Sequence, residues 1–183
     1  MIEFPKRYAD FVARLRVPSG FLIVLVFALL SRPSRGSMAW GVPVSVVGLL
    51  LRAWAAGCLD KNRHLSTAGP YSYTRNPLYL GTGFVAAGVA IAARSPWLAV
   101  LFALVFLFVY LPVIQLEEQH LRELFPEYEP YAARVRAFWP CLASAGRSAP
   151  AAFRFRLYIQ NEEYQADLGF ALALVYLLWR LPG

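Results

Sequence analysis

Long runs of apolar residues, separated by short polar stretches, make up most of the chain. A helix crosses the roughly 30 Å hydrocarbon core of a bilayer with about 20 apolar residues, and about 17 to 25 are tolerated. Runs that reach or approach this length occupy residues 18–31, 38–58, 78–93, 97–116 and 168–181. The pattern therefore predicts an all-α, polytopic helical membrane protein with about five transmembrane helices, in which residues 1–183 form a single integral membrane domain.

Residues that favour helix starts and helix ends mark the limits of these runs. Asn76 and Pro77 are a favoured N-cap and a favoured first helical residue, so they begin the third predicted span. Asn161 is placed to cap the last span, and Pro182 stops it. Between residues 117 and 140, apolar positions recur near helical spacing with prolines among them. This pattern predicts short amphipathic helices that lie on a membrane face.

The composition agrees with a membrane location. Hydrophobic residues make up 58% of the chain and charged residues 16%, so a soluble fold would expose large apolar patches. The net charge of +7 does not indicate nucleic-acid binding, because the basic residues flank the apolar runs and form no stripe interleaved with aromatic residues. Anionic lipid headgroups are the expected partners of the basic residues near the C-terminus, which are Arg134, Arg136, Arg147, Arg154 and Arg156.

The distribution of Lys and Arg predicts the orientation in the membrane. With the N-terminus in the cytosol, only Arg32, Arg35, Arg94 and Arg180 lie outside, and 14 of the 18 basic residues lie on or near the cytosolic side. The positive-inside rule favours this arrangement. We therefore expect a multi-pass protein of a prokaryotic inner membrane, with its amphipathic helices and its polar segments on the cytosolic face.

The first candidate for chemistry is the polar stretch 69–81, which opens into an apolar helix with Arg75 at its start. Free backbone amides at a helix start, together with a guanidinium, form a site for a carboxylate or a phosphate. Tyr79 follows Arg75 by four residues and could face the same cavity. The alternatives are that Arg75 anchors the helix among lipid headgroups and that Tyr79 belongs to an interfacial aromatic belt.

The second candidate is the pair Glu117 and Glu118, which follows about 20 uncharged residues of the fourth predicted span. Adjacent helical residues point about 100° apart, so one carboxylate can face inward beside Arg75 while the other pairs with Arg122 in solvent. Pro112 removes a backbone hydrogen bond from the same helix and is expected to kink it. The alternative is that the glutamates only mark where the helix leaves the lipid.

Neither a metal site nor a disulfide is expected. Cys58 and Cys141 lack metal-ligand spacing, and His64 and His120 are far apart in the chain. Glu117 and His120 have the spacing found in carboxylate di-iron bundles, but the sequence offers no second such pair. The chain also has no Gly-rich phosphate loop, nucleophile elbow or strand pattern, so a Rossmann-type cofactor domain is excluded.

Two groups of residues occur in a fixed order around a tight hairpin at 94–96. They are Gly69-Pro70-Tyr71 with Arg75-Asn76-Pro77-x-Tyr79-x-Gly81, and then Glu117-Glu118-x-x-Leu121, Phe125, Tyr128, Tyr131, Val135 and Pro140. In this order they resemble the isoprenylcysteine carboxyl methyltransferase and phospholipid methyltransferase family of integral membrane enzymes. The resemblance covers residues 40–140, which would be a methyltransferase-like core.

The resemblance implies a multi-span enzyme that binds S-adenosylmethionine at the cytosolic face. It implies methyl transfer to an amphiphilic acceptor, either the carboxylate of a prenylated or lipid-like substrate or a lipid amine. Arg75 and Glu118 are the predicted catalytic residues. The cofactor-binding residues that the resemblance implies are Tyr71, Arg75, Asn76, Pro77, Tyr79, Leu80, Gly81, Glu117, Glu118 and Tyr131.

The chain departs from the family pattern in two places. Asn76 stands where the family most often has His, so no imidazole role can be carried over. Residues 141–183, a basic segment and a final membrane helix, extend beyond the usual end of the family. They could cover the pocket, mediate self-association or serve as an anchor.

Two other functions fit parts of the sequence. Membrane sterol reductases share a related Arg-x-Pro-x-Tyr motif near a nicotinamide pocket, so an NADPH-dependent membrane reductase is one alternative. In a non-enzymatic membrane scaffold, residues 69–81 would only start a helix and the two glutamates would only end one. Stabilisation by S-adenosylhomocysteine, by NADPH or by neither distinguishes the three.

Overall fold

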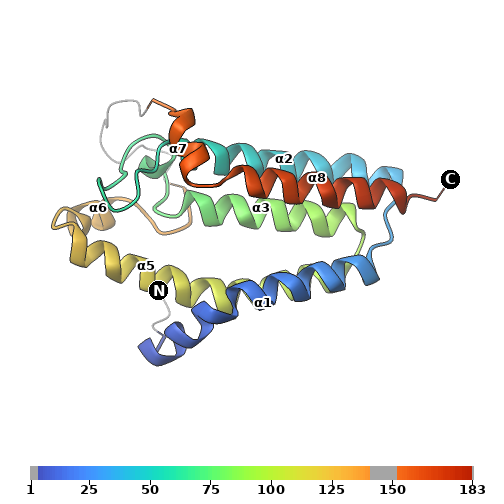
Figure 1. Ribbon diagram of the computed structural model, residues 1–183, viewed down its shortest axis with the longest axis horizontal. Coiled ribbons are helices and arrows are strands. Elements are labelled where there is room, and N and C mark those ends of the chain that lie inside the picture. The colour runs from blue at the N-terminus through green and yellow to red at the C-terminus, as the bar shows by residue number, and fades with distance from the viewer. Residues whose placement is uncertain (1–3, 141–151, 183) are drawn as a thin grey trace.

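The computed structural model describes residues 4–140 and 152–182, and within them every regular element is a helix (Figure 1). The elements in chain order are α1 (Lys6–Leu30), α2 (Arg35–Gly57), the 3₁₀ turn η1 (Gly69–Ser72), α3 (Pro77–Ala92), α4 (Pro96–Val105), the π-helical segment η2 (Phe106–Tyr110), α5 (Leu111–Leu124), α6 (Tyr128–Arg134), α7 (Phe155–Gln160) and α8 (Tyr164–Trp179). The all-α prediction is therefore confirmed for the described residues. Cys141 and Arg147 lie outside them.

Helices α2 and α3 pack closely because glycines on both helices let the backbones approach. A Cβ atom at Gly48 would lie 2.6 Å from the carbonyl oxygen of Gly81, and one at Gly88 would lie 2.5 Å from that of Gly41. Small residues at such contacts permit the van der Waals packing that drives helix association in lipid. The two helices thus form a close-packed pair on which the loops at one end of the molecule are built.

The remaining long helices arrange around this pair. Helix α1 packs on the continuous rod α4–η2–α5, where Val12 meets Val105 and Val109, and the two lie beneath α2, α3 and α8 in the view of Figure 1. Helix α8 is held at both ends: Leu177 joins the apolar cluster at one end of the molecule, and Glu163 forms an ion pair with α2 near the other.

Two helical stretches, Arg35–Gly57 and Pro96–Leu124, are long and apolar enough to cross a membrane. The apolar helices Pro18–Leu30, Pro77–Ala92 and Tyr164–Trp179 are shorter. All five predicted runs are therefore helical, but their lengths do not establish five spans. The third is short because the chain turns directly after Ala92, where Arg94 takes a positive φ of 52° and α4 starts at Pro96.

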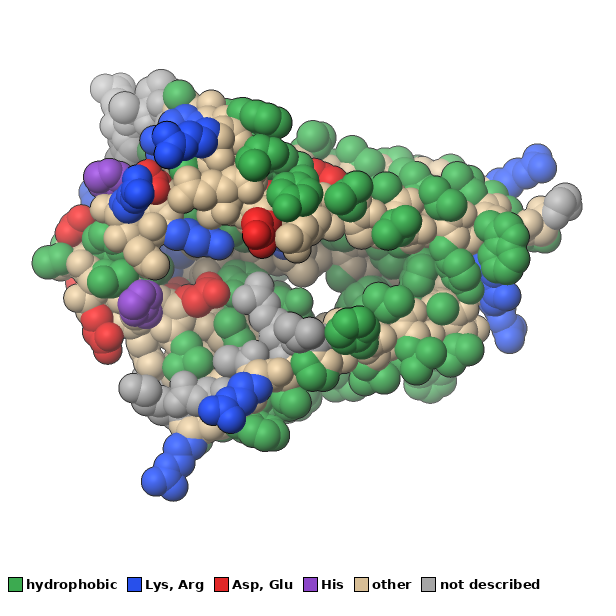
Figure 2. Space-filling view, viewed as in Figure 1, with side chains coloured by type: hydrophobic (Ala, Val, Ile, Leu, Met, Phe, Trp, Pro, Cys, Tyr) green, Lys and Arg blue, Asp and Glu red, His purple; other side chains and the backbone are tan. Residues whose placement is uncertain are grey.

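The surface fits a membrane protein. Apolar side chains cover most of the length of the bundle and basic side chains gather at its ends (Figure 2). Trp40, Trp97 and Trp179 lie at one end of their helices and are 77%, 69% and 75% exposed. Exposed tryptophans at a common level are typical of the boundary between hydrocarbon and headgroups.

The predicted capping role of Asn161 is wrong. Helix α8 begins at Tyr164, while Asn161 follows the last residue of α7. Its side-chain amide donates to the carbonyl oxygens of Ala56 at 3.0 Å and Leu59 at 2.8 Å. The amide therefore adds a second hydrogen bond at the last turn of α2 and one to the residue that follows it, and so ties the C-terminal segment to this end of the helix.

The fourth predicted span deviates from regular α-helix earlier than expected. Five residues, Phe106–Tyr110, form a π-helical segment, and Pro112 follows within α5. A π-bulge widens one helical turn and often marks a functional site. Helix α5 then carries both glutamates to the end of the bundle, where α6 folds back against it through the buried side chains of Tyr128 and Tyr131.

Candidate functional site

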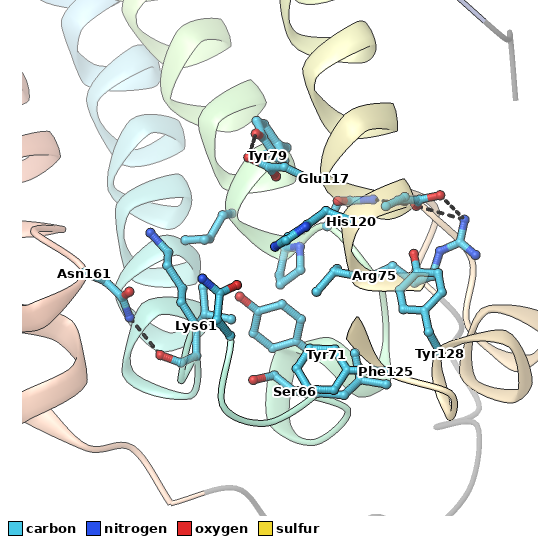
Figure 3. Close-up of a pocket in the computed structure, with 18 of the residues that line it drawn as sticks. Lys61, Ser66, Tyr71, Arg75, Tyr79, Glu117, His120, Phe125, Tyr128 and Asn161 are labelled. Carbon is cyan, nitrogen blue, oxygen red and sulfur yellow. Dashed lines mark hydrogen bonds and ion pairs between the residues drawn. The ribbon is translucent and has the colours of Figure 1, made fainter. Parts of the chain in front are cut away.

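A cavity of about 510 Å³ lies at the end of the bundle where α2, α3 and α5 meet α6 and the start of α8 (Figure 3). Its walls combine charged side chains with aromatic ones. The lining residues are Arg52, Leu59, Lys61, Asn62, His64, Leu65, Ser66, Tyr71, Arg75, Asn76, Pro77, Leu78, Tyr79, Thr82, Tyr110, Glu117, Glu118, His120, Leu121, Phe125, Tyr128, Tyr131, Asn161 and Glu163. A volume of this size suits a small-molecule ligand, since such pockets span about 300–1,000 Å³.

Arg75 and Glu118 meet in one wall of this cavity. The Nη2 atom of Arg75 lies 3.1 Å from Oε1 and 3.4 Å from Oε2 of Glu118, and their side chains are 13% and 6% exposed. Nη1 of Arg75 donates to the carbonyl oxygen of Ala132 at 3.2 Å, and its backbone amide donates to that of Arg136 at 2.9 Å. Helix α6 and the segment directly after it therefore hold Arg75 from one side, while Glu118 holds it from another.

Asn76 occupies the N-cap position of α3, as predicted, but its side chain does not cap the helix. Its Nδ2 atom donates to the carbonyl oxygen of Ala137 at 3.2 Å and to Oε1 of Glu118 at 3.5 Å. The amide therefore helps to fix the Glu118 carboxylate from a second direction.

Both glutamates line the cavity, which corrects the prediction that one of them pairs with Arg122. The Tyr79 hydroxyl donates to Oε1 of Glu117 at 2.9 Å. Arg122 pairs instead with Glu129 at 2.9 Å and lies 5.7 Å from the centre of the Tyr128 ring. The reason is that α6 folds back beside α5 and brings its own carboxylate closer to Arg122.

Three buried polar side-chain atoms have no hydrogen-bond partner among the described residues, and all three belong to residues that line the cavity. They are the Tyr71 hydroxyl, Nε of Arg75 and the Tyr128 hydroxyl. A buried polar group left without a partner costs about 1–3 kcal/mol. Figure 3 shows the Tyr71 side chain directed into the cavity. These donors lie in the layer of side chains that forms the cavity wall.

Three of the tyrosines around the cavity, Tyr71, Tyr128 and Tyr131, have raised pKa values and are hydrogen-bond donors at neutral pH. Burial raises the pKa of Tyr71 and of Tyr131 above the ordinary tyrosine value. Burial, and then the negative charge of Glu118, raises the pKa of Tyr128 to about 12. The Tyr131 hydroxyl donates to the carbonyl oxygen of Tyr71 at 2.7 Å, which positions η1 against α6.

The opposite wall contains a second ion pair that the sequence patterns did not predict. Nε of Arg52 on α2 lies 2.5 Å from Oε1 of Glu163, which directly precedes α8. Nη1 of Arg52 donates to the Thr82 hydroxyl on α3. The available signal was Arg52 itself, the single charged residue in the apolar run 38–58.

Eight of the ten residues predicted to bind a cofactor line the cavity, and two do not. The eight are Tyr71, Arg75, Asn76, Pro77, Tyr79, Glu117, Glu118 and Tyr131. Leu80 is half-buried on α3 outside the lining. Gly81 faces α2, where an added Cβ would lie 2.6 Å from Cγ of Arg52 and 2.8 Å from the carbonyl oxygen of Gly48. Gly81 therefore serves helix packing, and ligand binding by the other eight stays a prediction.

Within the described ranges, no group of three or more His, Cys, Asp and Glu side chains is placed to hold a metal ion. Cys58 is a free thiol there. His64 and His120 both line the cavity, each beside polar and aromatic neighbours.

Comparison with known proteins gives a family match that spans most of the segments lining the cavity. Residues 49–128 match the model of the phospholipid methyltransferase family, a range that contains Arg52, Arg75 and both glutamates. The nickel-cobalt-cadmium resistance protein NccN of Alcaligenes xylosoxydans xylosoxydans is 32% identical over 157 residues, which cover 78% of this chain and 72% of that protein. The cobalt-zinc-cadmium resistance protein CzcN of Cupriavidus metallidurans is 37% identical over 105 residues, or 56% of this chain and 47% of that protein. No solved structure matches the chain.

Proposed function

The chain belongs to the phospholipid methyltransferase family, and from this premise we propose that it is a membrane enzyme that transfers a methyl group from S-adenosylmethionine to an amphiphilic acceptor. The observation that carries the proposal is the cavity whose wall brings together the buried Arg75–Glu118 pair, Glu117 and the buried tyrosines Tyr71 and Tyr131. By the positive-inside rule, this end of the molecule lies at the cytosolic face of the membrane.

The lining residues suit S-adenosylmethionine. Its carboxylate needs a cationic donor, and the guanidinium of Arg75 lines the cavity. Its ammonium and its ribose hydroxyls need acceptors, and Glu117 and Glu118 supply carboxylate oxygens. The Tyr71 hydroxyl is a protonated donor without a partner in the described protein. The carboxylate, the ammonium and the ribose hydroxyls of this cofactor thus each have a complementary group on the cavity wall.

When bound, the cofactor supplies an electrophilic methyl group on a positively charged sulfur. The residues of the chain then have to align an acceptor and keep water away from it. Tyr79, held by Glu117, and Tyr110 meet edge to face with ring centres 5.9 Å apart. These rings form an apolar, water-excluding part of the wall at the level of the π-helical segment.

The identity of the acceptor determines how much acid–base chemistry the site must perform. A carboxylate needs no proton transfer, whereas an ammonium must first lose a proton to a base. His120 and Glu117 line the cavity and are the groups that could accept it. The proposed function covers both acceptor classes.

Ligand-induced stabilisation of purified protein in detergent tests the proposal. S-adenosylhomocysteine at a hundred times its Kd should stabilise the fold by about 2.7 kcal/mol. For a chain of this length, that corresponds to a rise in Tm of about 5–10 °C. A rise with NADPH and none with S-adenosylhomocysteine would identify a reductase, and no rise with either would leave the scaffold as the better description.

The names of the two relatives connect them with resistance to nickel, cobalt, cadmium and zinc. We propose that methyl transfer by this chain serves the same physiological setting. A bacterial host that expresses the chain should change its growth limit in cobalt or cadmium, and a host that expresses the Arg75→Ala variant at the same level should not. Equal growth of the two hosts at every metal concentration would refute this role.

A further inference from the structure

The second ion pair of the cavity, between Arg52 and Glu163, leaves part of the Arg52 guanidinium for a ligand. Arg52 and Glu163 face each other across the gap between α2 and the start of α8, with side chains 22% and 7% exposed. Among the described residues, the hydrogen bonds to the Arg52 guanidinium use Nε, toward Glu163, and Nη1, toward Thr82 and the carbonyl oxygen of Leu78. Contacts with α3 and with the C-terminal segment thus fix the plane of the Arg52 guanidinium, which lines the cavity. Its Nη2 atom can donate to a further acceptor.

The position of Arg52 along α2 corresponds to a depth in the membrane at which charged side chains are rare. It follows the exposed Trp40 by 12 residues on α2, which is about 18 Å along the helix axis. If Trp40 marks one boundary of a hydrocarbon core about 30 Å thick, Arg52 lies inside the opposite boundary by about 12 Å. A guanidinium at such a depth is costly, and charged residues of this kind usually bind substrates or ions.

The charges around the cavity favour an anionic second ligand. Arg52, Lys61 and Arg75 are balanced by Glu117, Glu118 and Glu163, so the lining carries no net charge if the histidines are neutral. S-adenosylmethionine carries one net positive charge from its sulfonium, ammonium and carboxylate groups. An acceptor with one negative charge makes the two ligands together neutral, whereas an ammonium acceptor would leave two positive charges in a buried site.

We propose that Arg52, held by Glu163 and Thr82, binds the carboxylate of the methyl acceptor, and that the acceptor is a lipid-soluble carboxylic acid. This inference rests on the proposed methyl transfer and names the acceptor class of that same cavity. A carboxylate oxygen forms the new bond to the methyl carbon while the bond from that carbon to sulfur breaks. The bonding electrons stay on the sulfur as a neutral thioether, and no proton moves.

The chemistry also predicts how the Arg52 contact acts. The guanidinium attracts the charged carboxylate and loses most of that attraction when the neutral ester forms. Its contribution therefore lies in binding and orientation of the acid and in release of the ester. Loss of Arg52 should raise the KM for the acid more than it lowers kcat, because the contact stabilises the bound acid at least as strongly as the transition state.

Equilibrium binding of two matched probes to protein loaded with S-adenosylhomocysteine tests the proposal without turnover. The probes are decanoate and decylamine, which share one alkyl chain and differ in the sign of their charge. Wild-type protein should bind decanoate saturably and more tightly than decylamine. The Arg52→Gln variant should bind decanoate at least tenfold more weakly, and Arg52→Lys should recover part of the affinity. Arg180→Gln, at the other end of the molecule, should equal wild type.

The affinity for S-adenosylhomocysteine, measured on the same samples, distinguishes a failure of the acceptor site from a failure of the cofactor site. A retained affinity in Arg52→Gln shows that the variant is folded and that the cofactor site is intact. Decanoate binding that is absent in wild type, equal in Arg52→Gln or weaker than decylamine binding would overturn the acceptor assignment while leaving methyl transfer standing. If wild-type protein does not bind S-adenosylhomocysteine, the proposed function itself is refuted.

Discussion

The Arg75–Glu118 pair is expected to be a strongly coupled unit of the fold, and a double-mutant cycle measures this. The single variants are Arg75→Met and Glu118→Leu, and the double variant combines them. Each single substitution leaves one buried charge without its partner, because the two side chains are only 13% and 6% exposed. Removing one member of a buried pair costs about 3–5 kcal/mol. The double variant removes both charges and leaves only neutral partners, such as the Ala132 carbonyl oxygen, without a donor.

The expected magnitudes follow from these contacts. Each single variant should lower Tm by about 6–20 °C, since 1 kcal/mol corresponds to about 2–4 °C in a protein of this size. The double variant should be less destabilised than the sum of the two singles by at least about 2 kcal/mol. The assay is thermal unfolding in detergent, followed by tryptophan fluorescence.

A matched control is available at the exposed pair Arg122–Glu129, whose side chains are 47% and 64% exposed. Exposed pairs contribute about 0–1 kcal/mol, so Arg122→Met should shift Tm by at most a few degrees. Single variants of the buried pair that unfold like this control, or effects that simply add in the double variant, would refute the reasoning about burial and coupling.

Three further predictions use other parts of the molecule. Tyr71→Phe removes a buried hydroxyl without a partner, so the free protein should be equally stable or more stable while its affinity for S-adenosylhomocysteine in a binding titration falls about five- to tenfold. Gly48→Val should separate α2 from α3 and strongly lower the yield of folded protein in size-exclusion chromatography, whereas Gly83→Ala, at a position open to added atoms, should not. Burial raises the pKa of Tyr128 from 10.0 to about 12, so above pH 10 this tyrosine ionises in the unfolded chain before it does in the folded one, and the fold loses stability as the pH rises toward 12. Tyr128→Phe should therefore reduce the alkaline fall in Tm.

The proximity of Arg75 and Glu118 could be predicted from the sequence for a topological reason. The connection between α3 and α4 is only the turn 93–95, so the two helices must run in opposite directions. The start of the one and the end of the other then lie at the same end of the bundle. Hydrophobic run length and helix-start chemistry located both ends, with Asn76 and Pro77 at the first of them.

Other features depend on contacts that no local pattern encodes. The bend of the chain after Phe125 brings Glu129 to Arg122, so i to i+4 spacing alone paired Arg122 with the wrong partner. Arg52 and Glu163 are separated by 111 residues, and their pairing requires knowledge of where α8 packs. Gly81 belongs to the motif of residues 75–81, yet its neighbour across the interface is Gly48, which makes it a packing residue. Sequence therefore predicted the ends of the helices better than the partners of individual side chains.

The central claim is that one cleft, closed by Arg75 and Glu118, holds the methyl donor. Equilibrium binding of radiolabelled S-adenosylmethionine to purified wild-type and Glu118→Gln protein tests it most directly, with Arg94→Gln as the control at the far end of the molecule. The account predicts one saturable site per chain in wild type and control, displaced by S-adenosylhomocysteine, and an affinity at least tenfold lower in Glu118→Gln. Absence of saturable binding in wild type, or equal affinity in all three proteins, would contradict it.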